Sequence, residues 1–132
     1  MLCKIRLSEK KMDLRELYEE FYESLSDSTG TVLIHHGKAK YPGKYTEDYK
    51  WINLFVKDSE ALELLQEKGE ELFKKYNLNK LMFVHQIGKI SKNDTILFLG
   101  VEAKDRNTAF EGVRQMLEYV KMEHLIGLEE VP

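Results

Sequence analysis

Basic side chains at close spacing are the residues of this sequence best suited to chemistry. Lys38, Lys40 and Lys44 stand near Gly37 and the Pro42-Gly43 pair. Glycine lets the backbone come close to a ligand, and a turn at Pro42-Gly43 would lie on the surface. Several cations in one segment suit a ligand that carries a phosphate or a carboxylate.

A second pair of cations, Lys104 and Arg106, precedes a predicted helix that begins near Thr108. Residues two apart in an extended segment point to the same side, so both cations would share one side. The first turn of the helix adds free amide donors for an anion. Together the two groups could surround one phosphate, although the residues alone favour the interpretation that these are ordinary solvated surface lysines.

The histidines and the cysteine favour structural roles. His35 and His36 are adjacent in a predicted strand, so they point to opposite faces and cannot easily share a metal ion. One of them is expected in the core and the other at the surface. His85 lies in an apolar strand, which favours a hydrogen-bonded structural histidine, and Cys3 has no apparent activating partner.

Composition and missing motifs narrow the function further. The sequence has no glycine-rich dinucleotide fingerprint, phosphate loop, paired-cysteine knuckle or His-Glu-x-x-His motif. Its 132 residues, 42% of them apolar, predict one domain over residues 1–132. A net charge of −3 argues against a general nucleic-acid binder, and no apolar run reaches the roughly 20 residues that cross a bilayer. One cysteine and the lack of a secretory signal predict a reducing cytoplasm.

Hydrophobic periodicity predicts an α+β domain with three helices and a mixed or antiparallel sheet. The predicted strands are Cys3–Leu7, Thr31–Lys40, Tyr49–Val56, Leu81–Ile87 and Thr95–Val101. The predicted helices have caps at Asp13, at Asp58 or Ser59, and at Thr108, and the first extends to Leu25. The strand at Tyr49–Val56 is expected to be central with both faces partly buried, and the last two strands are expected to form a hairpin. The final eleven residues have no clear period.

Residues 84 to 121 contain a His-x-Ile-Gly start, a turn that ends near an aspartate, an apolar strand, an arginine before Ala-Phe, and a helix that closes on lysine. The residues concerned are His85, Ile87, Gly88, Asp94, Arg106, Ala109, Phe110 and Lys121. In these features the segment resembles the large, catalytic subunit of molybdopterin synthase. The resemblance covers roughly residues 4 to 130.

The resemblance implies an α/β hammerhead fold and a homodimer that forms a heterotetramer with small subunits. It implies transfer of two sulfurs from the C-terminal thiocarboxylates of a ubiquitin-like small subunit to cyclic pyranopterin monophosphate. The product is the dithiolene of molybdopterin, and the step requires no metal or other cofactor. By the same resemblance Lys121 is catalytic, Lys40 and Arg106 hold the substrate phosphate, and Lys38 supports the rim of the site.

The sequence also departs from the family pattern at functional positions. A family histidine before the arginine becomes Asp105, whose negative charge should weaken phosphate binding. The family continues after the first lysine with Pro-x-Trp-Lys-x-Glu, and here Gly127 replaces the tryptophan, Leu128 replaces the second lysine and Glu130 keeps the acid. An active sulfurtransferase and a non-catalytic paralogue that binds the small subunit or the pterin phosphate without turnover both stay open. A plain dimeric scaffold is a third alternative.

Overall fold

The computed structural model describes residues 2–121 and 124–132 of the chain. Its strands are β1 (Cys3–Ser8), β2 (Thr31–Lys38), β3 (Trp51–Val56), β4 (Lys80–Gln86), β5 (Gly88–Ile90), β6 (Thr95–Ala103) and β7 (Ile126–Val131). Its helices are α1 (Leu14–Tyr22), α2 (Ala61–Lys75) and α3 (Arg106–Lys121). The predicted α+β class with three helices is confirmed.

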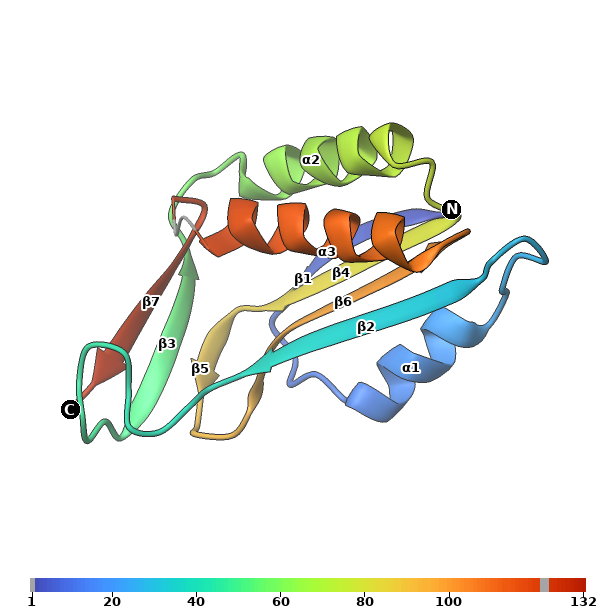
Figure 1. Ribbon diagram of the computed structural model, residues 1–132. Helices are drawn as coiled ribbons and strands as arrows, with labels where there is room; N and C mark the ends of the chain where they lie inside the picture. Colours follow the sequence, from blue (N-terminus) through green and yellow to red (C-terminus); the bar gives the residue numbers. More distant parts are fainter. Residues whose placement is uncertain (1, 122–123) are drawn as a thin grey trace.

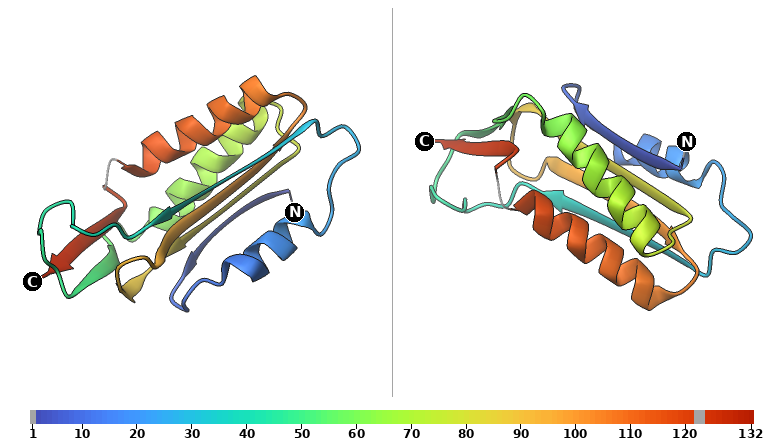
Figure 2. Two further views of the ribbon diagram at one scale, coloured as in Figure 1. Left: turned by 60° about the horizontal axis from the view of Figure 1, so that its bottom comes forward. Right: turned by 90° about the horizontal axis from the view of Figure 1, so that it is seen from above.

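A mixed four-stranded sheet of order β1-β4-β6-β2 forms the larger layer. Strand β1 runs parallel to β4, whereas β4 with β6 and β6 with β2 are antiparallel. Helices α2 and α3 cover one face of this sheet and α1 covers the other (Figures 1 and 2). Over the residues that the structure describes, none of the helices is long and apolar enough to cross a membrane.

A second, antiparallel sheet of order β5-β3-β7 lies beyond one end of the first (Figure 1). Strands β4 and β6 pair as the predicted hairpin requires, but the connection between them is longer than a turn. Gly88, with a φ of 102°, leads into β5, which pairs with β3 of the second sheet. Strand β3 is central, with Ile52 and Leu54 buried on one face and Trp51 and Asn53 half-buried on the other, as predicted.

Helix α1 is shorter than predicted at its C-terminal end. The Asp13 side chain caps its start by accepting the amides of Arg15 and Glu16. The helix ends at Tyr22, and Leu25, expected on its apolar stripe, is 45% exposed. The helix ends here because a lysine of β4 donates hydrogen bonds to the carbonyl groups at this end.

That lysine, Lys80, forms a buried ion pair with Glu102 of β6, the residue opposite it in the sheet. Its Nζ donates to the carbonyls of Phe21 and Ser24, both at 2.8 Å, and lies 3.1 Å from Oε2 of Glu102. The other carboxylate oxygen of Glu102 accepts the amide of Ser26 and the hydroxyl of Thr29. Burial alone would raise the pKa of Glu102, but these hydrogen bonds and Lys80 hold the pKa below its usual value.

Helix α2 begins later than a cap at Asp58 or Ser59 predicts. The Asp58 carboxylate accepts the amide of Glu60 at 2.8 Å, and the first helical residue follows Glu60. Leu62, expected in the apolar stripe, is 45% exposed. At the other end Asn77 adopts a φ of 48°, the left-handed conformation that commonly terminates a helix.

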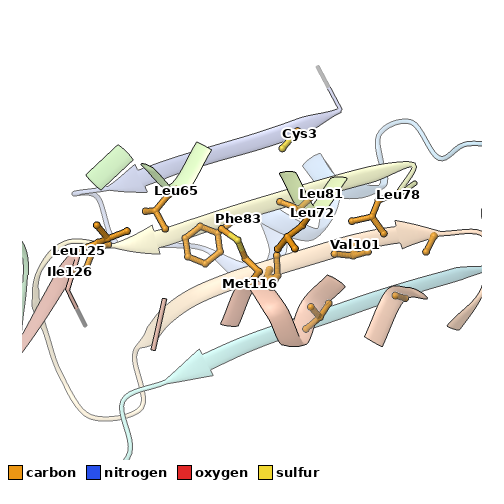
Figure 3. Close-up of a cluster of buried hydrophobic side chains, with 14 of the residues drawn as sticks. Cys3, Leu65, Leu72, Leu78, Leu81, Phe83, Val101, Met116, Leu125 and Ile126 are labelled. Atoms are coloured by element: carbon orange, nitrogen blue, oxygen red, sulfur yellow. The ribbon is translucent and has the colours of Figure 1, made fainter. Parts of the chain in front are cut away.

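The main hydrophobic core lies between α2, α3 and one face of the larger sheet (Figure 3). Its large buried side chains include Leu65, Leu72, Leu81, Phe83, Val101 and Met116. Gly69 in α2 faces β1, where an added Cβ would meet Cδ1 of Ile5 at 2.8 Å. The glycine that weakens the helix intrinsically therefore lets α2 pack closely on the sheet.

Strand β7 is an element that the sequence pattern did not predict. It pairs with β3 from Ile126 to Val131, and its Glu130 side chain is 9% exposed. The Glu130 carboxylate accepts the backbone amides of Lys44 at 2.6 Å, Tyr45 at 2.7 Å and Thr46 at 2.6 Å. A buried anion therefore organises the loop between β2 and β3.

The loop glycine at position 43 makes room for this anion. A Cβ on Gly43 would come within 2.5 Å of Oε1 of Glu130. The space beside this glycine is therefore occupied by a carboxylate of the chain itself, where the sequence suggested an anionic ligand. Burial alone would raise the pKa of Glu130, but the three amide donors and nearby Lys40 hold the pKa below its usual value.

We expect Lys80→Met to lower the free energy of unfolding by about 3–5 kcal/mol, because the Glu102 carboxylate stays buried without its cation. Urea denaturation measures the change, with Lys74→Met on the exposed surface of α2 as the control. Adding Glu102→Gln should recover part of the loss. A Lys80→Met protein as stable as the control would contradict a structural role for the pair.

We expect Glu130→Gln to lower the free energy of unfolding at pH 7 by about 1–3 kcal/mol, because a neutral amide replaces the buried acceptor of three amides. The depressed pKa of Glu130 means that its contribution is complete above the unfolded value of about 4.3 and is lost as pH falls through the folded pKa. The gap between parent and variant should therefore narrow on acidification. Glu129→Gln, on the exposed side of β7, is the control in denaturation series from pH 7 to pH 3.

Candidate active site

A pocket of about 290 Å³ lies at the seam between the two sheets, beneath the C-terminal part of α3. Its lining residues are His35, Leu54, His85, Ile96, Leu97, Leu117, Val120, Lys121, Ile126, Gly127 and Leu128. The walls are mainly aliphatic, and the titratable groups among these lining residues are two histidines and one lysine. A pocket with apolar walls and few polar groups is typical of a ligand site.

Packing of α3 determines where Lys121 lies. The buried side chains of Ala109, Val113 and Met116 hold the helix against the sheet. The helix returns along β6, so its last residue, Lys121, comes to the end where β6 begins and β7 starts (Figure 1). Lys121 is exposed and lines the pocket. Of the four predicted site residues, all within the described part of the chain, it is the one that this pocket contains.

The same lysine ends an open groove along the outer surface of α3. This groove, of about 470 Å³, is lined by Phe110, Val113, Arg114, Leu117, Glu118 and Lys121. Phe110 is 57% exposed, whereas Ala109 and Val113 of the same helix are buried. The outward position of Phe110 leaves an aromatic side chain on a surface that leads from Arg106 toward Lys121.

The two neighbouring histidines differ from their predicted placement. His35 and His36 are both exposed, so neither is the core histidine that was expected. Strand alternation turns His35 toward the pocket, and its Nε2 lies 3.9 Å from where a Cβ on Gly37 would be. Partial burial, and then the neighbouring His36, lower the pKa of His35.

His85 is buried and hydrogen-bonded, as predicted. It is 4% exposed, and its Nδ1 lies 2.8 Å from the carbonyl oxygen of Gln86. Burial lowers the pKa of His85, although the hydrogen bond to Gln86 acts in the opposite direction. The ring nevertheless lines the pocket beside Lys121, which the sequence pattern did not indicate.

The first cationic cluster lies near the pocket but outside its lining. Nζ of Lys38 donates to Oδ1 of Asn93 at 2.9 Å, in the turn between β5 and β6. The segment is tied to that turn because the Ala39 amide donates to Asp94 and the Asn93 amide donates to Ala39. Lys40 is exposed close to the Glu130 carboxylate. Both lysines therefore lie at the pocket end of β2.

Arg106 lies at the opposite end of the molecule from Lys121. The two residues are the first and last of the 16-residue helix α3, so they are roughly 22 Å apart along its axis. Lys38 is likewise distant from Arg106, because Thr31, at the other end of β2, pairs with Ala103. Within one copy of the chain these cations therefore lie too far apart to surround one phosphate.

The predicted start of α3 also needs correction. Asp105, not Thr108, caps the helix, because its carboxylate accepts the amide and the hydroxyl of Thr108 at 2.9 and 3.0 Å. The hydrogen bonds from Thr108 lower the pKa of Asp105, despite a small opposing effect of burial. Amide donors that were expected to hold a ligand anion are thus partly used by the side chain of Asp105. Lys104 binds Oδ1 of Asn79 at 3.1 Å.

The C-terminal departures from the family pattern have clear structural positions. Leu128 lines the pocket and pairs with Leu54, where the family pattern has its second lysine. Gly127 pairs with Phe55, and a Cβ on this glycine would overlap the Phe55 ring. The aromatic ring of Phe55 therefore covers the strand where the family pattern has tryptophan. Glu130, the acid that the pattern retains, organises a loop.

Cys3 has the structural role that was predicted. It is buried in the main core, and burial, with a smaller effect of Glu70, raises the pKa of its thiol to about 11. A thiol with this pKa is protonated at neutral pH and is a poor nucleophile.

The pocket itself could have been anticipated from the sequence. Leu117, Val120 and Lys121 have a helical spacing that puts the lysine next to an apolar stripe.

Comparisons with known proteins agree with this architecture. The sequence matches the family described as "MoaE protein" over residues 7–123. The molybdopterin synthase catalytic subunit of Escherichia coli (strain K12) is 28% identical over 98 residues, which cover 74% of this chain and 52% of that protein. The chain thus spans about half the length of this curated relative. A 34% identical match covers only 10% of an ATP-dependent helicase/nuclease protein of Clostridium botulinum and carries no functional argument.

Solved structures share the fold at low sequence identity. Molybdopterin synthase from Staphylococcus aureus has a TM-score of 0.79 at 20% identity, covering 97% of this chain and 89% of that one. A further solved structure is the complex of subunits 1 and 2 of molybdopterin-converting factor from Helicobacter pylori 26695. One chain of that complex has a TM-score of 0.73 at 17% identity, and the match covers 98% of this chain and 84% of that one. Because the family match extends over most of the sequence, this chain belongs to the MoaE protein family.

Proposed function

We propose that this protein is a molybdopterin synthase-type sulfurtransferase of molybdenum cofactor biosynthesis. The observation that carries the proposal is the position of Lys121, at an apolar pocket between two sheets in a chain of the MoaE family. The donor is the thiocarboxylated C-terminus of a ubiquitin-like small subunit, and the acceptor is cyclic pyranopterin monophosphate. The likeness to a molybdopterin synthase catalytic subunit supports this pair of substrates. The single buried cysteine suits a reducing cytoplasm, where we expect the protein to act.

The shape and charge of the pocket suit the tail of the small subunit. A narrow apolar pocket of about 290 Å³ accommodates an extended, glycine-rich tail better than a bulky charged peptide. A thiocarboxylate is an anion, and the ammonium of Lys121 offers a cation and hydrogen-bond donors at the pocket. Lys121 thus orients the sulfur-bearing end of the tail and stabilises negative charge as sulfur departs.

In this proposal, a second copy of the chain supplies Arg106 to the substrate phosphate, because Arg106 and Lys121 of one copy lie at opposite ends of α3. Strand β2 is an outer strand of the larger sheet, and Arg106 follows β6 at the end where β2 begins. Antiparallel pairing of two β2 strands around a two-fold axis would bring Arg106 of each copy toward the Lys121 end of the other. Lys40 of the copy that provides Lys121 would then complete the phosphate site. The groove beside Phe110 would lie in the dimer interface.

A homodimer of this kind would bind one small subunit in each of its two pockets and so form a heterotetramer. The solved complex from Helicobacter pylori, which contains subunits 1 and 2 of its molybdopterin-converting factor, supports a small-subunit partner. Lys38, whose ammonium is held by Asn93, would act at the rim by keeping the end of β2 in place.

A second function is favoured by two specific observations. Leu128 contributes an aliphatic side chain to the pocket at the second lysine position, and Asp105 adds an anion beside Arg106. A paralogue with these residues would bind the small subunit or the pterin phosphate without turnover. Gel filtration with the thiocarboxylated small subunit, combined with an assay for molybdopterin, separates the two functions, because the paralogue forms the complex and no product.

We expect Lys121→Ala to lower the rate of molybdopterin formation by about 100-fold or more, because the pocket loses the cation that stabilises the departing sulfur. The assay mixes purified protein with cyclic pyranopterin monophosphate and thiocarboxylated small subunit. Lys74→Ala, on the exposed surface of α2, is the matched control and should retain the parent rate. A Lys121→Ala rate within a few-fold of the parent would refute the role of Lys121.

Mixing two inactive variants tests whether the site is shared between copies. Arg106→Ala and Lys121→Ala should each lose activity, but a denatured, mixed and refolded sample should regain about a quarter of the parent activity. Half of the dimers are then mixed, and each mixed dimer has one of its two sites intact. If the parent regains activity after the same refolding but the mixture does not, a site built from two copies is contradicted.

A further inference from the structure

We infer that His85 is a second functional group of this pocket, and that it accepts the proton released when the acyl–sulfur bond of the small-subunit tail is cleaved. The inference rests on the function proposed above and goes beyond it. The family resemblance carries a histidine at this position, but it assigns the chemistry to cationic side chains. The sequence pattern itself favoured a structural histidine.

Sulfur transfer from a thiocarboxylate has to replace sulfur by oxygen at the tail. Once the tail sulfur is bonded to the substrate carbon, the oxygen of a water molecule bonds to the tail carbonyl carbon. The acyl carbon–sulfur bond breaks, and its electron pair stays on sulfur, which leaves with the substrate as a thiolate. One proton of the water passes to His85, and the other leaves with the tail carboxylic acid, which ionises in solvent. His85 then returns its proton to solvent.

The hydrogen bond of His85 fixes which ring nitrogen can accept that proton. A carbonyl oxygen can only accept, so the contact of 2.8 Å to the Gln86 carbonyl requires the proton on Nδ1. In the neutral ring Nε2 therefore carries the lone pair. The ring cannot easily switch to the other tautomer, because that would leave the buried carbonyl of Gln86 without this donor.

Hydrogen bonds of its side chain fix the position of Gln86. The side-chain amide of Gln86 donates to the carbonyls of Ser8, Lys10 and Ile87 at 2.9, 3.2 and 3.0 Å. Its side-chain oxygen accepts the amide of Met12 at 3.1 Å. A histidine held by a well-anchored partner resembles the base of a catalytic pair, in which a second group orients the imidazole.

The surroundings of His85 keep the ring neutral. Neighbouring strands present Leu7 from β1 and Leu97 from β6, and β7 adds the aliphatic lining of the pocket. The titratable groups that line the pocket with His85 are His35 from β2 and Lys121 from α3. Burial lowers the pKa of His85, so the ring is unprotonated at neutral pH and can accept a proton. Lys121 supplies the cation that the departing sulfur needs.

The decisive variant is His85→Asn, whose side-chain amide can replace Nδ1 as the donor to Gln86 but has no counterpart of Nε2. The value of kcat/KM for molybdopterin formation is measured from pH 5 to pH 9 with subsaturating cyclic pyranopterin monophosphate and thiocarboxylated small subunit, because kcat/KM reports the ionisation of the free protein. The parent rate should fall on acidification at a pH below the ordinary histidine value of about 6.5, because burial lowers the pKa of His85. His85→Asn should be about 100-fold slower or more, and its rate should lack this acid limb.

His36→Asn is the matched control, because His36 is exposed and lies outside the pocket lining. It should keep the parent rate and pH profile, and both variants should bind the small subunit with parent affinity in calorimetry. NMR titration of His85 in the parent provides a readout that needs no variant, and its titration should coincide with the acid limb.

Three results would overturn the inference while leaving the proposed function in place. The first is a His85→Asn protein with parent rate and profile, and the second is an acid limb that is lost in His35→Asn instead. The third is an NMR titration of His85 that departs from the acid limb by more than about one pH unit, the spread of histidine pKa values in folded proteins. A parent protein that forms no molybdopterin at any pH would overturn the proposed function, and this inference with it.

Discussion

Burial of one face of α3 against the larger sheet is the interaction on which the rest of the site depends. Val113 and Met116 anchor the helix, and the chain direction then decides what each end of the helix meets. The C-terminal end reaches the seam with the second sheet, whereas the N-terminal end lies beside the start of β2. A single packed helix thus separates Arg106 and Lys121, so one copy of the chain cannot use both at one phosphate.

The seam between the two sheets provides what a tail-binding site needs. Strand β4 continues through Gly88 into β5, so the chain passes directly from one sheet to the other. The sheets diverge there, and the space between them is walled by aliphatic side chains and closed above by α3. In the proposed function, Lys121 would be the one cation that faces an anionic tail across otherwise aliphatic walls. Activity with one lysine is therefore physically reasonable despite Leu128.

Several residues that look available for ligands are used by the fold. Glu130 holds the loop after β2 through three amides, Gly43 makes room for it, and Asp105 caps α3. Phe55 covers Gly127 where the family pattern has tryptophan. Two departures from the family pattern, Asp105 and Gly127, are thus accommodated by local contacts of the fold.

The sequence alone determined the class of the fold, because alternating and helical periods record which faces are buried. Lys121 was singled out by the resemblance of residues 84 to 121 to the family pattern, and the structural role of Cys3 was expected from the lack of an activating partner. Strand β7 was missed, since Gly127, Glu129 and Glu130 break the usual alternation and the strand is stabilised by pairing with β3 and by the loop on Glu130. Tertiary structure alone decided that Lys38 and Lys40 lie at the pocket end of the molecule, that Arg106 lies at the opposite end, and that His85 lines the pocket. Those relations depend on the direction in which α3 packs and on the meeting of two sheets, which no local spacing encodes.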